Sequence, residues 1–92
     1  MTSIRLSRDA ERDVDDIIVH YSKFSDKIAN RVLGDIRKVF AQLAEFPESG
    51  PRLAIAELRK AVSPKYRFVI LYQYDGNTIE IAQVYRHQNR EF

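Results

Sequence analysis

Residues 66–77 read YRFVILYQYDGN, and this stretch decides the fold class. It is rich in aromatic and β-branched residues and its middle is apolar on both faces, which is typical of a central strand. The Asp75-Gly76-Asn77 sequence predicts a hairpin, because glycine tolerates a positive φ angle. Residues 78–86 are then the partner strand. Strict alternation along it predicts two faces, one with Ile79, Ile81, Gln83 and Tyr85, the other with Glu80, Ala82, Val84 and Arg86.

The chain before this hairpin is helical in its periodicity. Residues 3–7 alternate polar and apolar and predict a short strand, after which Ser7 can cap a helix. Apolar residues recur at helical spacing as far as Tyr21 and fade near Lys23. The opposite face of this helix carries three acidic residues, for which a solvated surface is the favoured interpretation: Asp13, Asp15 and Asp16.

A second helix is predicted to begin at Ser25 and to end close to Phe46, because Pro47 disfavours a helical conformation in the residue before it. The short connection predicts an antiparallel helical hairpin. After the turn cluster at 47–51, residues 58–62 read as another strand. The sequence therefore predicts one α+β domain over residues 1–92, in the order β-α-α-β-β-β, with the helical hairpin packed on one face of a small, mainly antiparallel sheet.

Composition excludes several classes of function. The chain has no cysteine, which removes disulfides, thiolate catalysis and cysteine-ligated zinc. No apolar run approaches the roughly 18 residues of a membrane span, and the start of the chain has no signal-peptide pattern, so we expect a cytoplasmic protein without membrane contacts. No glycine-rich phosphate loop or hydrolase motif is present, and the two histidines, His20 and His87, are far apart. We therefore expect neither a metal nor a cofactor.

The charge is unevenly distributed, although the formal net charge is only +2. Residues 1–46 contain eight basic and eight acidic residues and balance. Residues 51–74 contain five basic residues against one acidic residue, Glu57. This segment is either an ordinary solvated surface or a face that attracts a polyanion or an acidic partner.

Basic and aromatic residues are predicted to meet at one corner of the sheet. Antiparallel pairing of the last two strands would bring Tyr66 and Arg67 close to Arg86 and His87. Such a cluster could bind phosphates, stack bases or cleave RNA, in which case the catalytic candidates are His87, Arg67, Arg86 and Tyr85. Alternatively, long cations simply rim a small sheet. The candidate set for binding a target or a nucleic acid is Arg59, Lys60, Lys65, Tyr66, Arg67, Arg86, His87 and Arg90.

Several segments in a fixed order resemble the ParE/RelE superfamily of bacterial toxins. They are the helical stretch 10–17 followed by Tyr21, LAEFPESG at 43–50, YRFVILY at 66–72, IEI at 79–81 and VYRHQNRE at 84–91. Together they cover nearly the whole chain. The end motif, in which His87 precedes the Arg90-Glu91 pair, is most similar to the ParE, or plasmid-stabilisation, branch.

This resemblance implies a type II toxin that a small ParD-like or other antitoxin neutralises by direct binding in a hetero-oligomer. ParE relatives poison DNA gyrase and block replication without being enzymes, whereas RelE relatives cut mRNA on the ribosome. We expect the gyrase inhibitor, with the ribosome-dependent endoribonuclease as the alternative. A non-toxic module that binds nucleic acid or antitoxin is a third hypothesis.

The antitoxin is expected to cover the sheet face opposite the helices. An amphipathic segment could bury apolar residues there, while its acidic residues meet basic ones. The expected antitoxin-binding residues are Leu58, Arg59, Arg67, Val69 and Leu71.

Overall fold

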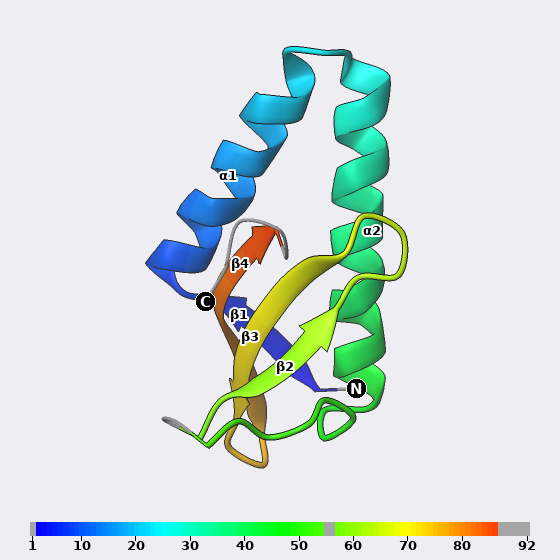
Figure 1. Cartoon of the computed structure of the whole chain (residues 1–92). Coiled ribbons are helices and arrows are strands. Elements are labelled where there is room, and N and C mark those ends of the chain that lie inside the picture. Colours follow the sequence, from blue (N-terminus) through cyan, green and yellow to red (C-terminus); the bar gives the residue numbers. More distant parts are fainter. Residues whose placement is uncertain (1, 55–56, 87–92) are drawn as a thin grey trace.

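The four strands form one open, mixed sheet in the order β1-β4-β3-β2 (Figure 1). A computed structural model describes residues 2–54 and 57–86. The elements are β1 (Ser3–Leu6), α1 (Arg8–Ser22), α2 (Asp26–Glu45), β2 (Arg59–Val62), β3 (Phe68–Tyr74) and β4 (Thr78–Arg86). β1 runs parallel to β4, and the other two pairings are antiparallel. The predicted α+β class and the order β-α-α-β-β-β are confirmed.

Serine side chains begin both helices, as the sequence predicts. The Ser7 hydroxyl accepts a hydrogen bond from the Ala10 amide, and the Ser25 hydroxyl accepts one from the Ile28 amide, both at 3.0 Å. Each bond satisfies an amide that has no partner within its own helix. No helix in the described ranges is long and apolar enough to cross a membrane.

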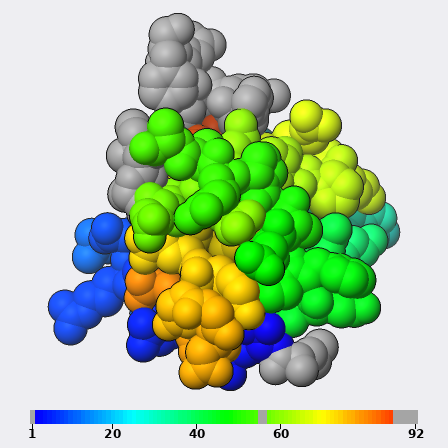
Figure 2. Space-filling view, turned by 90° about the horizontal axis from the view of Figure 1, so that it is seen from below, coloured from blue at the N-terminus to red at the C-terminus, as the bar shows by residue number. Residues whose placement is uncertain are grey.

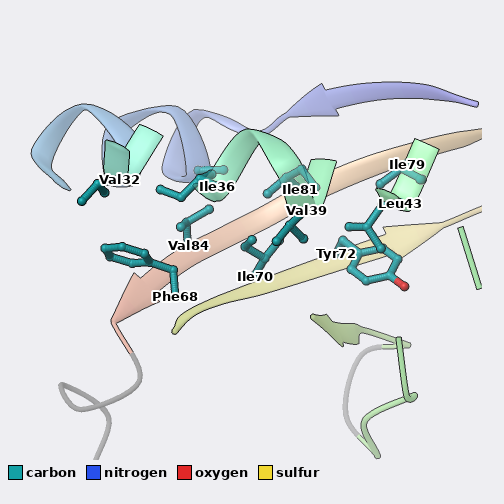
Figure 3. Close-up of a cluster of buried hydrophobic side chains, with 11 residues drawn as sticks. Val32, Ile36, Val39, Leu43, Phe68, Ile70, Tyr72, Ile79, Ile81 and Val84 are labelled. Atoms are coloured by element: carbon teal, nitrogen blue, oxygen red, sulfur yellow. The ribbon is translucent and has the colours of Figure 1, made fainter. Parts of the chain in front are cut away.

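The core lies between the helical hairpin and one face of the sheet (Figure 3). Alternate residues of β3, namely Phe68, Ile70 and Tyr72, point toward α2 and are fully buried. Residues on the opposite face of β3, Val69 and Leu71, lie outside this cluster, although Val69 is itself buried. The two-sided apolar character of residues 66–74 thus reflects a strand that has one face on the core and one on the far side of the sheet. The main core residues are Ala10, Val32, Ile36, Val39, Leu43, Phe68, Ile70, Tyr72, Ile79, Ile81 and Val84.

A β-bulge in β4 overturns the predicted alternation of that strand. Leu71 pairs with Gln83 but Tyr72 pairs with Ile81, so Ala82 is an extra residue. Val84 and Arg86 therefore share the helix-facing side with Ile79 and Ile81, and the prediction that they lie on the other face was wrong.

The start of α1 stabilises this bulge, beyond the point where β1 ends. The Ser7 hydroxyl donates to the Ala82 carbonyl at 2.9 Å, and the Asp13 carboxylate accepts from the Val84 amide at 3.0 Å. These two side chains replace the strand partner that β4 loses after Ile81. The expected solvated face holds for Asp15 and Asp16, which are exposed, but was wrong for Asp13.

The β2–β3 turn lies beside the middle of α2 (Figure 1), and the side chain of Asp35 fastens it there. This residue is charged, yet it is only 6% exposed. One carboxylate oxygen accepts from the Lys65 amide at 3.2 Å and the other from the Tyr66 amide at 2.8 Å. A buried carboxylate is tolerated here because both oxygens have backbone donors.

The segment after α2 is tied to the sheet by Tyr72 and Arg59. The Tyr72 hydroxyl donates to the Pro47 carbonyl and accepts from the Gly50 amide, both at 3.0 Å. The Arg59 guanidinium donates to the carbonyls of Glu48 and Gly50. In Figure 2 this segment, in green, lies across the end of the sheet beside the orange β3–β4 hairpin.

The β3–β4 hairpin carries a pH-dependent contribution to stability. Asp75 accepts hydrogen bonds from the Thr78 and Asn77 amides, at 2.7 and 2.8 Å, and these bonds lower the pKa of its carboxyl below the ordinary value. A carboxyl group whose pKa is lower in the folded state than in the unfolded state stabilises the fold when it is ionised. This stabilisation is fully present above the unfolded-state pKa and is lost as the pH falls through the folded-state pKa. We expect the stability difference between the wild type and Asp75→Asn to narrow between about pH 5 and about pH 2 in urea titrations. A constant difference over that range would contradict the assignment.

Candidate functional site

A groove separates α1 from the end of β4, at the corner that the sequence singles out. Its volume is about 260 Å³. Charged and aromatic groups gather in it because the bulge turns Arg86 toward α1. The lining residues are Asp13, Asp16, Ile17, His20, Tyr21, Val84, Tyr85 and Arg86.

The aromatic ring of Tyr21, in α1, holds the cation of this groove. The guanidinium carbon of Arg86 lies 5.8 Å from the centre of the Tyr21 ring, within the range of a cation–π contact. The His20 ring packs edge-on against Tyr21 at 5.0 Å and against Phe24 at 5.6 Å. The groove thus offers an arginine on an aromatic support, with Asp16 and His20 exposed at its rim. Such a site can bind an anionic or hydrogen-bonding group of a partner.

The described residues of the predicted corner lie on different surfaces of the molecule. Phe68 pairs with Arg86, so the start of β3 does meet the end of β4. Arg67 is exposed at that junction with a φ angle of 63°, a left-handed conformation that is uncommon outside glycine. Tyr85 pairs with Val69 on the face opposite the helices.

The other predicted basic residues lie away from this groove. Lys60 pairs with Leu71 on the far face of the sheet. Lys65 lies beside α2, with its ammonium 5.7 Å from the centre of the Tyr66 ring. His87 and Arg90 are outside the described residues.

The residues expected to bind an antitoxin are only partly accessible. Leu71 and Leu58 are half-buried, whereas Val69 is 1% exposed and already covered within the chain. Arg59 is half-buried and bonded to the carbonyls of Glu48 and Gly50, so its charge is committed to internal contacts. Arg67 is the exposed cation of this set.

Sequence reasoning missed the part of Asp13 in shaping the groove. This residue fixes the β4 backbone behind the groove, and in the sequence it is one of several acids on a helix face. The sequence contains one sign of the break in alternation along β4. Val84 is apolar, although strict alternation predicts that its side chain points away from the core. Within the described ranges, no three His, Asp or Glu side chains come together in a way that could hold a metal ion.

Comparisons with known proteins place the chain in a family. The sequence model for "ParE toxin of type II toxin-antitoxin system, parDE" matches residues 4–91. A solved structure described as "Chromosomal ParDE TA system from P. aeruginosa" is similar in fold, with a TM-score of 0.79 over 94% of this chain and 96% of that one, at 22% identity. No curated protein sequence gives a significant match. Because the family model spans almost the whole chain, this protein belongs to the ParE toxin family of type II toxin–antitoxin systems.

Proposed function

We propose that this ParE-family toxin inhibits DNA gyrase and that its cognate antitoxin neutralises it by direct binding. The observation that carries the proposal is the family match over residues 4–91, together with the resemblance of the chain to the branch whose members poison gyrase. The toxin would act by binding and trapping its target.

The geometry of the corner supports a binding protein over a ribosome-dependent nuclease. RNA cleavage needs an acid, a base and a cation around one phosphate. Neighbouring residues on a strand point to opposite faces, and here Arg86 faces α1 while Tyr85 lies on the far face of the sheet. Both residues border the groove beside α1, but their side chains leave the strand in opposite directions, which does not favour joint action on one phosphate.

The antitoxin is proposed to cover the sheet face that carries Leu71, next to the exposed Arg67. Leu71 is half-buried there, and Lys60 and Val62 of β2 lie beside it on the same face. A partner with an apolar stripe flanked by acidic residues complements this surface.

Induction of the toxin in growing bacteria distinguishes the two target classes. We expect DNA breaks and an SOS response, no codon-phased mRNA cuts, and recovery of growth when the antitoxin gene beside it is co-expressed. Arg86→Ala should weaken gyrase binding about thirtyfold if the groove arginine is a binding hot spot, and should abolish growth inhibition.

The matched control is Arg52→Ala. Arg52 is exposed, and its ion pair with Glu57 is between two exposed side chains, so its loss should leave toxicity intact. Circular dichroism of both variants checks that they fold. Codon-phased mRNA cuts without DNA breaks would refute the gyrase proposal in favour of the nuclease. If the Arg86→Ala variant folds and is still toxic, the groove is not the surface that binds the target.

A further inference from the structure

A second, more basic groove lies between α2 and the β2–β3 turn. Its volume is about 590 Å³. Gly34 leaves it open, since a Cβ atom added there would meet nothing within 4 Å. The lining residues are Arg31, Gly34, Asp35, Lys38, Pro64 and Lys65.

The groove has three basic side chains against one acidic side chain, so its net charge is positive. Arg31, Lys38 and Lys65 are exposed, and none takes part in an ion pair among the described residues. The one acidic residue, Asp35, is buried and has both oxygens occupied by backbone amides. Along α2, Lys27 extends the same stripe, four residues before Arg31.

We infer that this groove binds the phosphate groups of a nucleic-acid backbone. Arg31 and Lys38 are seven residues apart on one helix, which separates them by about 10 Å along its axis, or about three nucleotide steps of a strand. Lys65 faces them from the β2–β3 turn. Flexible cations in such a row neutralise phosphates without reading bases.

A nucleic acid fits this surface better than an acidic protein does. Protein interfaces depend on apolar or aromatic anchors in well-packed pockets. Here the lining offers only Gly34 and Pro64 besides its charged residues. Phosphate binding needs no such anchor, because counterion release supplies most of its free energy.

The test is fluorescence anisotropy of the purified full chain with a labelled DNA duplex of about 20 base pairs, in about 50 to 200 mM salt. Gyrase is absent from this assay, so its result does not depend on the proposed target. The variant Arg31→Ala/Lys38→Ala/Lys65→Ala should bind at least about tenfold more weakly, with a slope of log K against log salt smaller by about three.

The matched control removes the same number of charges from the region of α1: Arg8→Ala/Arg12→Ala/Lys23→Ala. These cations are exposed and make no ion pair among the described residues. The proposal requires the control to bind within about twofold of the wild type. Equal weakening of both variants would overturn it, because attraction by net charge alone would then explain binding. The proposal would also be overturned if the groove variant lost affinity for a polyglutamate peptide but bound DNA as well as the wild type does. The groove would then be a site for an acidic protein.

Discussion

Replacing Asp35 by Ala is expected to lower the free energy of unfolding by about 3 kcal/mol. The carboxylate is the acceptor for two backbone amides, those of Lys65 and Tyr66, at 3.2 and 2.8 Å. Ala would leave both amides without this acceptor in a partly buried place and would release the β2–β3 turn from α2. Hydrogen bonds to a charged acceptor contribute about 1.5–3 kcal/mol each, and water can partly replace the lost acceptor in the variant.

Urea unfolding followed by circular dichroism measures this effect, with Asp15→Ala as the control. Asp15 is exposed in α1, so its removal should change stability by no more than about 0.5 kcal/mol. Asp35→Asn keeps the shape but replaces one acceptor by a donor, so it should recover at most half of the loss. If Asp35→Asn were as stable as the wild type, the two hydrogen bonds would not be the source of the effect.

The sequence was sufficient for the element order because each boundary carries a local signal. Ser7 and Ser25 cap the two helices, Pro47 follows the end of α2, and the Asp75-Gly76 pair marks the hairpin. These signals act within a few residues of the chain, so periodicity and turn chemistry reveal them.

The candidate site was less predictable because it depends on contacts between distant segments. The bulge at Ala82 is held by Ser7 and Asp13, about seventy residues earlier in the chain. A single inserted residue in the ladder reverses which side chains face the helices. Without that contact, Arg86 is predicted on the wrong face, and the groove beside α1 cannot be foreseen.

The balanced charge of residues 1–46 likewise conceals a separation in space. Summed along the chain, their acidic and basic residues cancel. In the structure, the exposed acids Asp15 and Asp16 belong to α1, whereas Arg31 and Lys38 line a groove on α2. Asp35 lies between them, but both of its oxygens accept hydrogen bonds from the turn amides, so it forms no ion pair with these cations. This second basic surface is recognised only when the positions of Arg31 and Lys38 on α2 and the hydrogen-bond partners of Asp35 are known.

Gly50→Ala is expected to cost about 2–4 kcal/mol, although glycine-to-alanine changes are often mild. A Cβ atom at this position would lie 2.5 Å from the Lys60 carbonyl oxygen and 2.7 Å from the Tyr72 hydroxyl. The turn cannot shift to make room without losing the bonds that Tyr72 and Arg59 make to it. Gly34→Ala is the matched control: it lies in open space in α2 and should stabilise the protein by up to about 1 kcal/mol.

A double-mutant cycle with Tyr72→Phe identifies the origin of this cost. Tyr72→Phe alone removes the buried acceptor of the Gly50 amide and should cost about 1–3 kcal/mol. In the double variant the hydroxyl that crowds the new methyl group is absent and its hydrogen bond is already lost, so the combined loss should be smaller than the sum of the single losses by at least about 0.5 kcal/mol. Strict additivity, measured by urea unfolding of all four proteins, would mean that the Lys60 carbonyl alone opposes the methyl group.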